Sequence, residues 1–133
     1  MPLPPSLAVD VGVAEAFFGE LRARYDGPLA VEPRHARWFD ADVDLLLTVW
    51  EVARVAADAA RVPADAVAGG WPATVHYRLH GSPRMYHSCD NDAFLDRVAE
   101  QLLSAPTGAW CIFDNTTLGA ATGHALGVAE RVR

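Results

Sequence analysis

Lysine is absent from the sequence, and every one of the 11 basic residues is arginine, set against 17 Asp and Glu for a net charge of -6. A chain without lysine has no P-loop lysine, Schiff-base lysine or pyridoxal-phosphate lysine, so several large enzyme classes are excluded. The acidic balance also argues against a nucleic-acid partner, because affinity for phosphate backbones comes largely from an excess of basic residues.

Cysteine and long apolar runs are scarce as well. The two cysteines, Cys89 and Cys111, show neither CxxC spacing nor a histidine-pair pattern, so neither a zinc site nor a disulfide framework is indicated. No apolar run approaches the ~20 residues of a membrane helix, and the first residues lack the features of a signal peptide. We therefore expect a cytoplasmic protein with no membrane partner. The sequence does not identify a cofactor.

The length of 133 residues and a hydrophobic content of 51% are typical of a single globular domain, spanning residues 1–133. Apolar residues at helical spacing predict helices after Asp10, after Asp40 or Asp42, after Asn91, and from Leu118 to about Val132. Strands are predicted over residues 29–31, 52–57, 74–79 and 109–113, with residues 61–71 as a loop. Strands that alternate with helices are typical of βαβ units, so the predicted class is α/β with parallel strands.

Polar side chains follow each of the four predicted strands. They are Glu32, Arg34 and His35 after the first, Asp58 after the second, Arg78 and His80 at the end of the third, and Asp114 and Asn115 after the fourth. Because the carboxyl ends of parallel strands form the ligand-binding rim of α/β folds, we expect these residues to converge in space.

At these residues the sequence resembles the YecE-like family, also called domain-of-unknown-function family 72. The resemblance rests on four ordered motifs: Leu3 to Ser6; Glu32, Arg34 and His35 with Trp38; Tyr77 to Gly81; and Phe113 to Thr116 with Gly123, His124 and Ala125. The family resembles TIM barrels, which take ~250 residues, so the resemblance implies the back half of such a barrel. It implies no reaction.

A half-barrel of four parallel strands would leave two strand edges unpaired and one apolar face uncovered. We therefore expect a homo-oligomer, or a partner chain that completes the barrel. This expectation also supports one of two functional hypotheses, a noncatalytic binding or assembly module.

The other hypothesis is an enzyme, or the relic of one, that acts on a small anionic molecule carrying phosphate or carboxylate. Arg34 and Arg78 would hold the anion, since Glu32 can offset only one of the two guanidinium charges. Glu32 and His80 would move protons, with His35 as another candidate base, Asn115 would orient an oxygen, and Asp58 would complete the ligand-binding residues.

The same residues also have structural or metal-binding interpretations. Glu32 and Arg34 could form an ion pair that merely neutralises the interior. Glu32, His35, Asp58 and His80 are donors able to bind a divalent metal, but no close ligand pair such as HExxH is present, and we predict no metal site. His124 reads as a structural histidine. Cys89 and Cys111 are interpreted as ordinary small residues, because no adjacent activating base is evident from the sequence.

Overall fold

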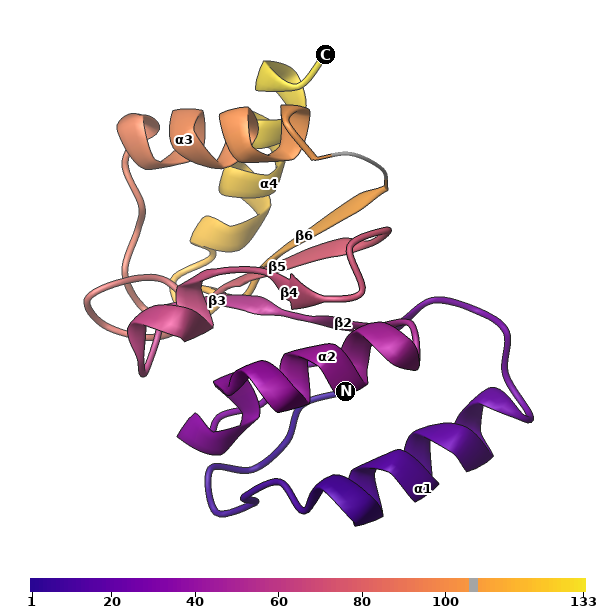
Figure 1. Cartoon of the computed structure of the whole chain (residues 1–133). Helices are drawn as coiled ribbons and strands as arrows, with labels where there is room; N and C mark the ends of the chain where they lie inside the picture. The colour runs from indigo at the N-terminus through magenta and orange to yellow at the C-terminus, as the bar shows by residue number, and fades with distance from the viewer. Residues whose placement is uncertain (106–107) are drawn as a thin grey trace.

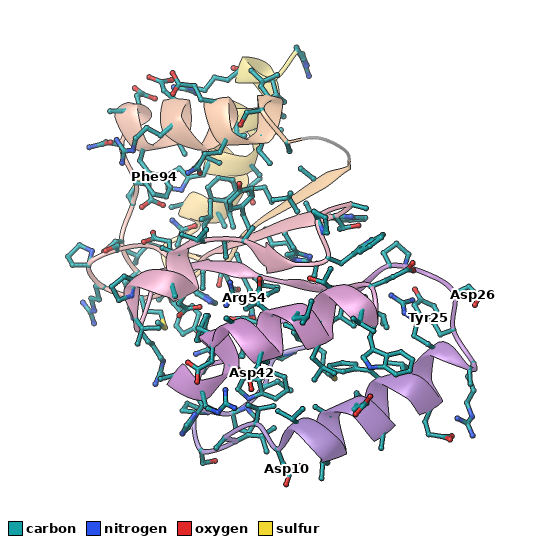
Figure 2. The ribbon with its side chains drawn as sticks, in the orientation of Figure 1. Asp10, Tyr25, Asp26, Asp42, Arg54 and Phe94 are labelled. Carbon is teal, nitrogen blue, oxygen red and sulfur yellow. The ribbon has the colours of Figure 1, made fainter. Side chains whose placement is uncertain are left out.

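The computed structural model describes residues 1–105 and 108–133. Its helices are α1 (Val11–Arg22), α2 (Ala41–Val49), α3 (Asp92–Leu103) and α4 (Ala120–Arg131), each close to a predicted helix. Asp10 lies at the start of α1 (Figure 2). It is the predicted cap, because its carboxylate accepts a hydrogen bond from the Val13 backbone at 3.1 Å. Asn91 caps α3 in the same way through Phe94, at 3.0 Å.

The strands form two three-stranded sheets, ordered β1-β2-β4 and β3-β5-β6. Their bounds are β1 (Leu29–Val31), β2 (Val52–Arg54), β3 (Ala56–Asp58), β4 (Gly69–Gly70), β5 (Val75–Leu79) and β6 (Ala109–Phe113). The predicted strand 52–57 is thus divided at Val55. Val55, between the two parts, is hydrogen-bonded to the end of β1, because its backbone donates to the Val31 carbonyl at 2.9 Å.

The expectation of parallel strands holds for β1 with β2, β3 with β5, and β5 with β6. It is wrong for β4, which is antiparallel to β2 and lies in the segment predicted as a loop. Gly70 has φ of 64°, and an added Cβ would collide with the Val52 carbonyl, so the close pairing of β4 on β2 requires glycine. The 3₁₀ helix η2 (Pro63–Ala66) precedes β4, and no α-helix connects β3 to β5.

The expectation of two unpaired edges is wrong at β1. The segment from Met1 to Leu3 runs alongside it: the Glu32 backbone donates to the Met1 carbonyl and the Leu3 backbone to the Glu32 carbonyl, both at 2.9 Å. The Met1 amino group adds a hydrogen bond to the Ala30 carbonyl at 2.8 Å. At the opposite end of the strand array, β6 is the outer strand of its sheet.

Helices lie on two sides of the strands, with α1 and α2 on one side and α3 and α4 on the other (Figure 1). Each side has its own apolar core. One is formed by Ala14, Phe18, Val31, Trp38, Val43, Leu47 and Val52, and the other by Leu79, Leu95, Val98, Ala99 and Val128. None of the helices in the described residues is long and apolar enough to cross a membrane. This packing fixes the strands whose ends carry the polar residues.

Candidate functional site

Glu32 is the centre of a polar cluster at the ends of β1, β5 and β6. It directly follows β1, and its residue surface is only 3% exposed. Oε1 accepts from Arg34 Nη2 at 3.1 Å and lies 3.3 Å from His80 Nε2, whereas Oε2 accepts from Arg78 Nη1 at 2.5 Å. The predicted convergence of Glu32, Arg34, Arg78 and His80 is therefore confirmed.

Asp114 is the second carboxylate of the cluster. Its Oδ2 accepts from Arg78 Nη2 at 2.7 Å and lies 3.1 Å from His80 Nδ1. The expectation that Glu32 alone faces the two arginines is wrong, because Asp114 offsets the second positive charge. The sequence had placed Asp114 at a strand end without giving it a role.

Both ring nitrogens of His80 face carboxylate oxygens. A neutral imidazole can donate to only one of them, whereas an imidazolium donates to both. The ring is also fixed edge-on against Tyr86, with centroids 5.4 Å apart. His80 is 1% exposed, so its orientation is set by the fold.

The charges around Glu32 determine its ionisation. Burial raises the pKa of its carboxyl, but hydrogen bonds from His80 and Arg78, together with the charges of Arg78 and Arg34, outweigh burial and lower the pKa to about 2. Burial lowers the pKa of Arg78, and the hydrogen bond and charge of Glu32 reverse this, so the net shift is upward. The cluster is therefore ionic at neutral pH.

A small pocket lies beside the cluster. It is lined by Glu32, Pro33, Arg34, Ala57, Ala59, Arg61, Asp65, His80 and Met85. Its cavity volume of about 10 Å³ has room for about one water-sized group. The pocket brings the basic side chains of Arg34, Arg61 and His80 to one small space.

Asp65 is the acidic residue on the other side of this pocket. It lies in η2 and is 3% exposed. Oδ2 accepts from the Arg61 backbone at 3.1 Å, and Oδ1 is buried with no hydrogen-bond partner among the described residues. Burial raises the pKa of Asp65, and the charge of Glu32 raises it further, although the Arg61 backbone opposes the shift. Sequence reasoning missed Asp65 because it falls in the segment predicted as a loop.

Three predicted site residues, His35, Asp58 and Asn115, make no side-chain hydrogen bond or ion pair with Glu32 within residues 1–105 and 108–133. His35 caps the 3₁₀ helix η1 (Ala36–Phe39), where its Nδ1 accepts from the Arg37 backbone at 3.2 Å. Asp58 lies next to the cluster, because its carbonyl accepts from the His80 backbone at 2.5 Å. Burial and the charge of Asp90 raise the pKa of its carboxyl, and the charge of His80 opposes this shift.

Asn115 is fully buried, and its amide donates to the Ser88 carbonyl at 2.9 Å. It belongs to a second cluster with Asp90 and His124, on the side of the strands covered by α3 and α4. No group of three or more His, Cys, Asp and Glu side chains in the described part of the chain could hold a metal ion.

The family model "Protein of unknown function DUF72" matches residues 1–133. The chain belongs to the DUF72 family. YecE-like is another name for this family, so the resemblance seen at the strand-end motifs is confirmed. No protein in the curated collection of characterised sequences matches the chain.

Solved structures of the DUF72 family share the fold. A protein from Thermotoga maritima is 21% identical with a TM-score of 0.73, and the match covers 97% of this chain and 55% of that one. For a protein from Enterococcus faecalis, one structure is 19% identical with a TM-score of 0.76, covering 97% of this chain and 58% of that one. A second structure is 16% identical with a TM-score of 0.74, covering 98% and 56%. The chain thus spans just over half the length of these relatives.

Proposed function

We propose that the pocket beside Glu32 binds an oxyanion group, phosphate or carboxylate, of a small molecule. The observation that carries the proposal is the position of Arg34 and Arg61 on the lining of one pocket, with His80 between the two carboxylates beside it. Arginine presents its donors in a planar fork that suits such anions. In the described structure, Arg34 uses Nη2 for Glu32, and its Nε and Nη1 remain for a ligand.

The charge balance supports the same ligand class. Glu32 and Asp114 offset Arg34 and Arg78, which leaves Arg61 and Asp65 as the remaining charged pair of the site. Burial raises the pKa of Asp65 and so disfavours the charge that would offset Arg61. The small cavity would admit one oxygen of the anion, with the rest of the ligand outside it.

The chemical roles follow from the same geometry. A carboxylate with a pKa of about 2 is a weak base at neutral pH, so Glu32 orients Arg34 and Arg78 instead of moving protons. His80 is the proton carrier in this proposal, because it bridges Glu32 and Asp114. Arg78 positions Glu32 and need not touch the ligand.

Thermal unfolding with added phosphate tests this function. A ligand that binds only the folded state raises the melting temperature, with a stabilisation of about 2.7 kcal/mol at a concentration one hundred times Kd. We expect phosphate to raise the melting temperature more than chloride at equal ionic strength. An equal effect of the two salts would contradict the proposal.

We also propose that residues 1–133 form half of a TIM barrel, completed by a second copy of the chain. The match covers 55% and 58% of the solved relatives, so a barrel of their size needs strands beyond those of residues 1–133. On the outer strand β6, Trp110 is 60% exposed and Ile112 is 42% exposed. Large apolar side chains on an outer strand are typical of a surface that pairs with another chain.

A further inference from the structure

A cysteine and a histidine meet in the second cluster, far apart in the sequence. Cys89 Sγ lies 3.3 Å from Nε2 of His124, a residue of α4. Cys89 is exposed, whereas His124 is 6% exposed and packs edge-on against Phe113 with ring centroids 5.6 Å apart. The sequence shows no adjacent base for Cys89, and the fold brings His124 to it.

The other ring nitrogen of His124 faces two polar side chains. Nδ1 lies 3.0 Å from Asn115 Nδ2 and 3.5 Å from Asp90 Oδ2. The two hydrogens of the Asn115 amide are also within reach of two oxygen acceptors, the Ser88 carbonyl at 2.9 Å and Asp90 Oδ2 at 3.2 Å. With the amide hydrogens on these two oxygens, Nδ1 carries its own hydrogen towards Asp90, and the lone pair of Nε2 is directed at Cys89. This is the tautomer that a base beside a nucleophile requires.

We propose that Cys89 is a nucleophile for acyl transfer, with His124 as its base and Asp90 as the residue that positions His124. The Cys89 thiol gives its proton to His124 Nε2, and the thiolate attacks the carbonyl carbon of an ester. The bond between that carbon and the ester oxygen breaks, and the leaving alkoxide takes the proton from Nε2. The acyl group is left as a thioester on Sγ, and water hydrolyses it to the acid and the thiol.

The surface beside Cys89 has room for such a substrate. A hollow of about 360 Å³ is lined by Asp58, Ser82, Cys89, Asp90, Asn91, Phe94 and Arg97. Phe94 lies on the side of the strands where α3 packs (Figure 2), and Arg97 stacks over its ring at 5.6 Å. The hollow thus places one aromatic ring and one cation beside Cys89 on a largely polar lining, and small acyl esters are the class of substrate that we infer.

Acylation by 4-nitrophenyl acetate tests the proposal. In a Cys111→Ser protein we expect a burst of 4-nitrophenolate and an acetyl adduct at Cys89, identified by peptide mass spectrometry. The rate is compared with that of a synthetic peptide of residues 85–93, which carries the same cysteine without the fold. We expect the folded protein to react about a hundredfold faster at pH 7. Equal rates would overturn the proposal.

Two variants separate a base from a merely structural histidine. His124→Ala, with its fold verified by circular dichroism, should lose about a hundredfold in acylation rate and regain part of it on addition of imidazole. A folded His124→Ala protein with an unchanged rate would overturn the proposal. Because His124 is buried, Asp90→Asn provides a second variant, for which we expect at least about a tenfold loss. An unchanged rate in Asp90→Asn would remove Asp90 from the mechanism.

The remaining cysteine provides the matched control. Burial raises the pKa of Cys111 to about 11. A Cys89→Ser protein, in which Cys111 is the remaining thiol, should therefore show no burst. A burst of the same size in Cys89→Ser would assign the reactivity to another group and contradict the proposal.

Discussion

Arg78 Nη1 lies 2.5 Å from Glu32 Oε2, although the two residues are 46 positions apart in the sequence. Glu32 follows β1 and Arg78 belongs to β5, and these strands lie in different sheets. The ion pair therefore crosses the segment of β2, Val55 and β3, which lies between β1 and β5. It joins the two sheets at the end where the pocket lies.

Replacing Glu32 with Gln should destabilise the fold. The carboxylate is buried and accepts from two arginines, so its loss leaves Arg34 and Arg78 without their common partner. We expect the free energy of unfolding at pH 7 to fall by about 3 kcal/mol in urea titrations. Glu20→Gln is the control, because Glu20 forms an exposed pair with Arg24 and should change stability by less than about 1 kcal/mol. A decrease in the free energy of unfolding of less than about 1 kcal/mol for Glu32→Gln would show that the ion pair does not stabilise the fold.

The same ion pair predicts the pH dependence of stability. The pKa of Glu32 falls from 4.5 to about 2 on folding, so its stabilising contribution is complete above the unfolded value. That contribution is lost as the pH falls from about 4.5 towards 2. Urea titrations across this range should show a smaller decline in Glu32→Gln than in the wild type. Parallel declines in the two proteins would contradict the assigned pKa.

Asp65→Asn should stabilise the protein at neutral pH. A group whose pKa is raised on folding favours the folded state at low pH, and this contribution is lost as the pH rises through the folded value. An amide keeps an oxygen for the Arg61 backbone and carries no charge. We expect a higher melting temperature at pH 7 and a smaller difference in acid. Asp26→Asn, at an exposed position, is the control. A lower melting temperature for Asp65→Asn at pH 7 would contradict this account.

Trp110→Glu tests the proposed assembly. In sedimentation velocity we expect the wild type to form dimers at micromolar concentration and Trp110→Glu to shift towards the monomer, since a charge on β6 opposes strand pairing. Leu45→Glu, at a position 65% exposed on α2, should leave the dimer unchanged. A stable, cooperatively folding wild-type monomer would refute the half-barrel assembly.

Much of the fold could be predicted from local sequence. Helix caps such as Asp10 and Asn91 act over three residues, so they are visible without tertiary structure. The division of the strand at Val55 could not be seen, because it depends on which strands pair on either side. The two-residue strand β4 is set by the close approach of Gly70 to β2, and the residues beside it carry no apolar alternation.

The site was predictable where it follows a general rule. Parallel strands bring their carboxyl ends together, which placed Glu32, Arg78 and His80 in one cluster. The rule does not specify which side of a strand a terminal side chain occupies, so it wrongly grouped Asn115 with Glu32. It also says nothing about contacts between a loop and a distant helix, such as that between Cys89 and His124.

Calorimetric titration with sulfate at constant ionic strength tests the proposed anion site most directly. Sulfate keeps its charge across neutral pH, so the heats report on the protein. The comparison uses the wild type, Arg34→Ala and the control Arg24→Ala, whose side chain is 69% exposed just after the end of α1. We predict saturable binding by the wild type and Arg24→Ala, and at least about tenfold weaker binding by Arg34→Ala, because a charged hydrogen bond contributes about 1.5–3 kcal/mol. Equal affinities for Arg34→Ala and the wild type, or no saturable binding by the wild type, would contradict the account.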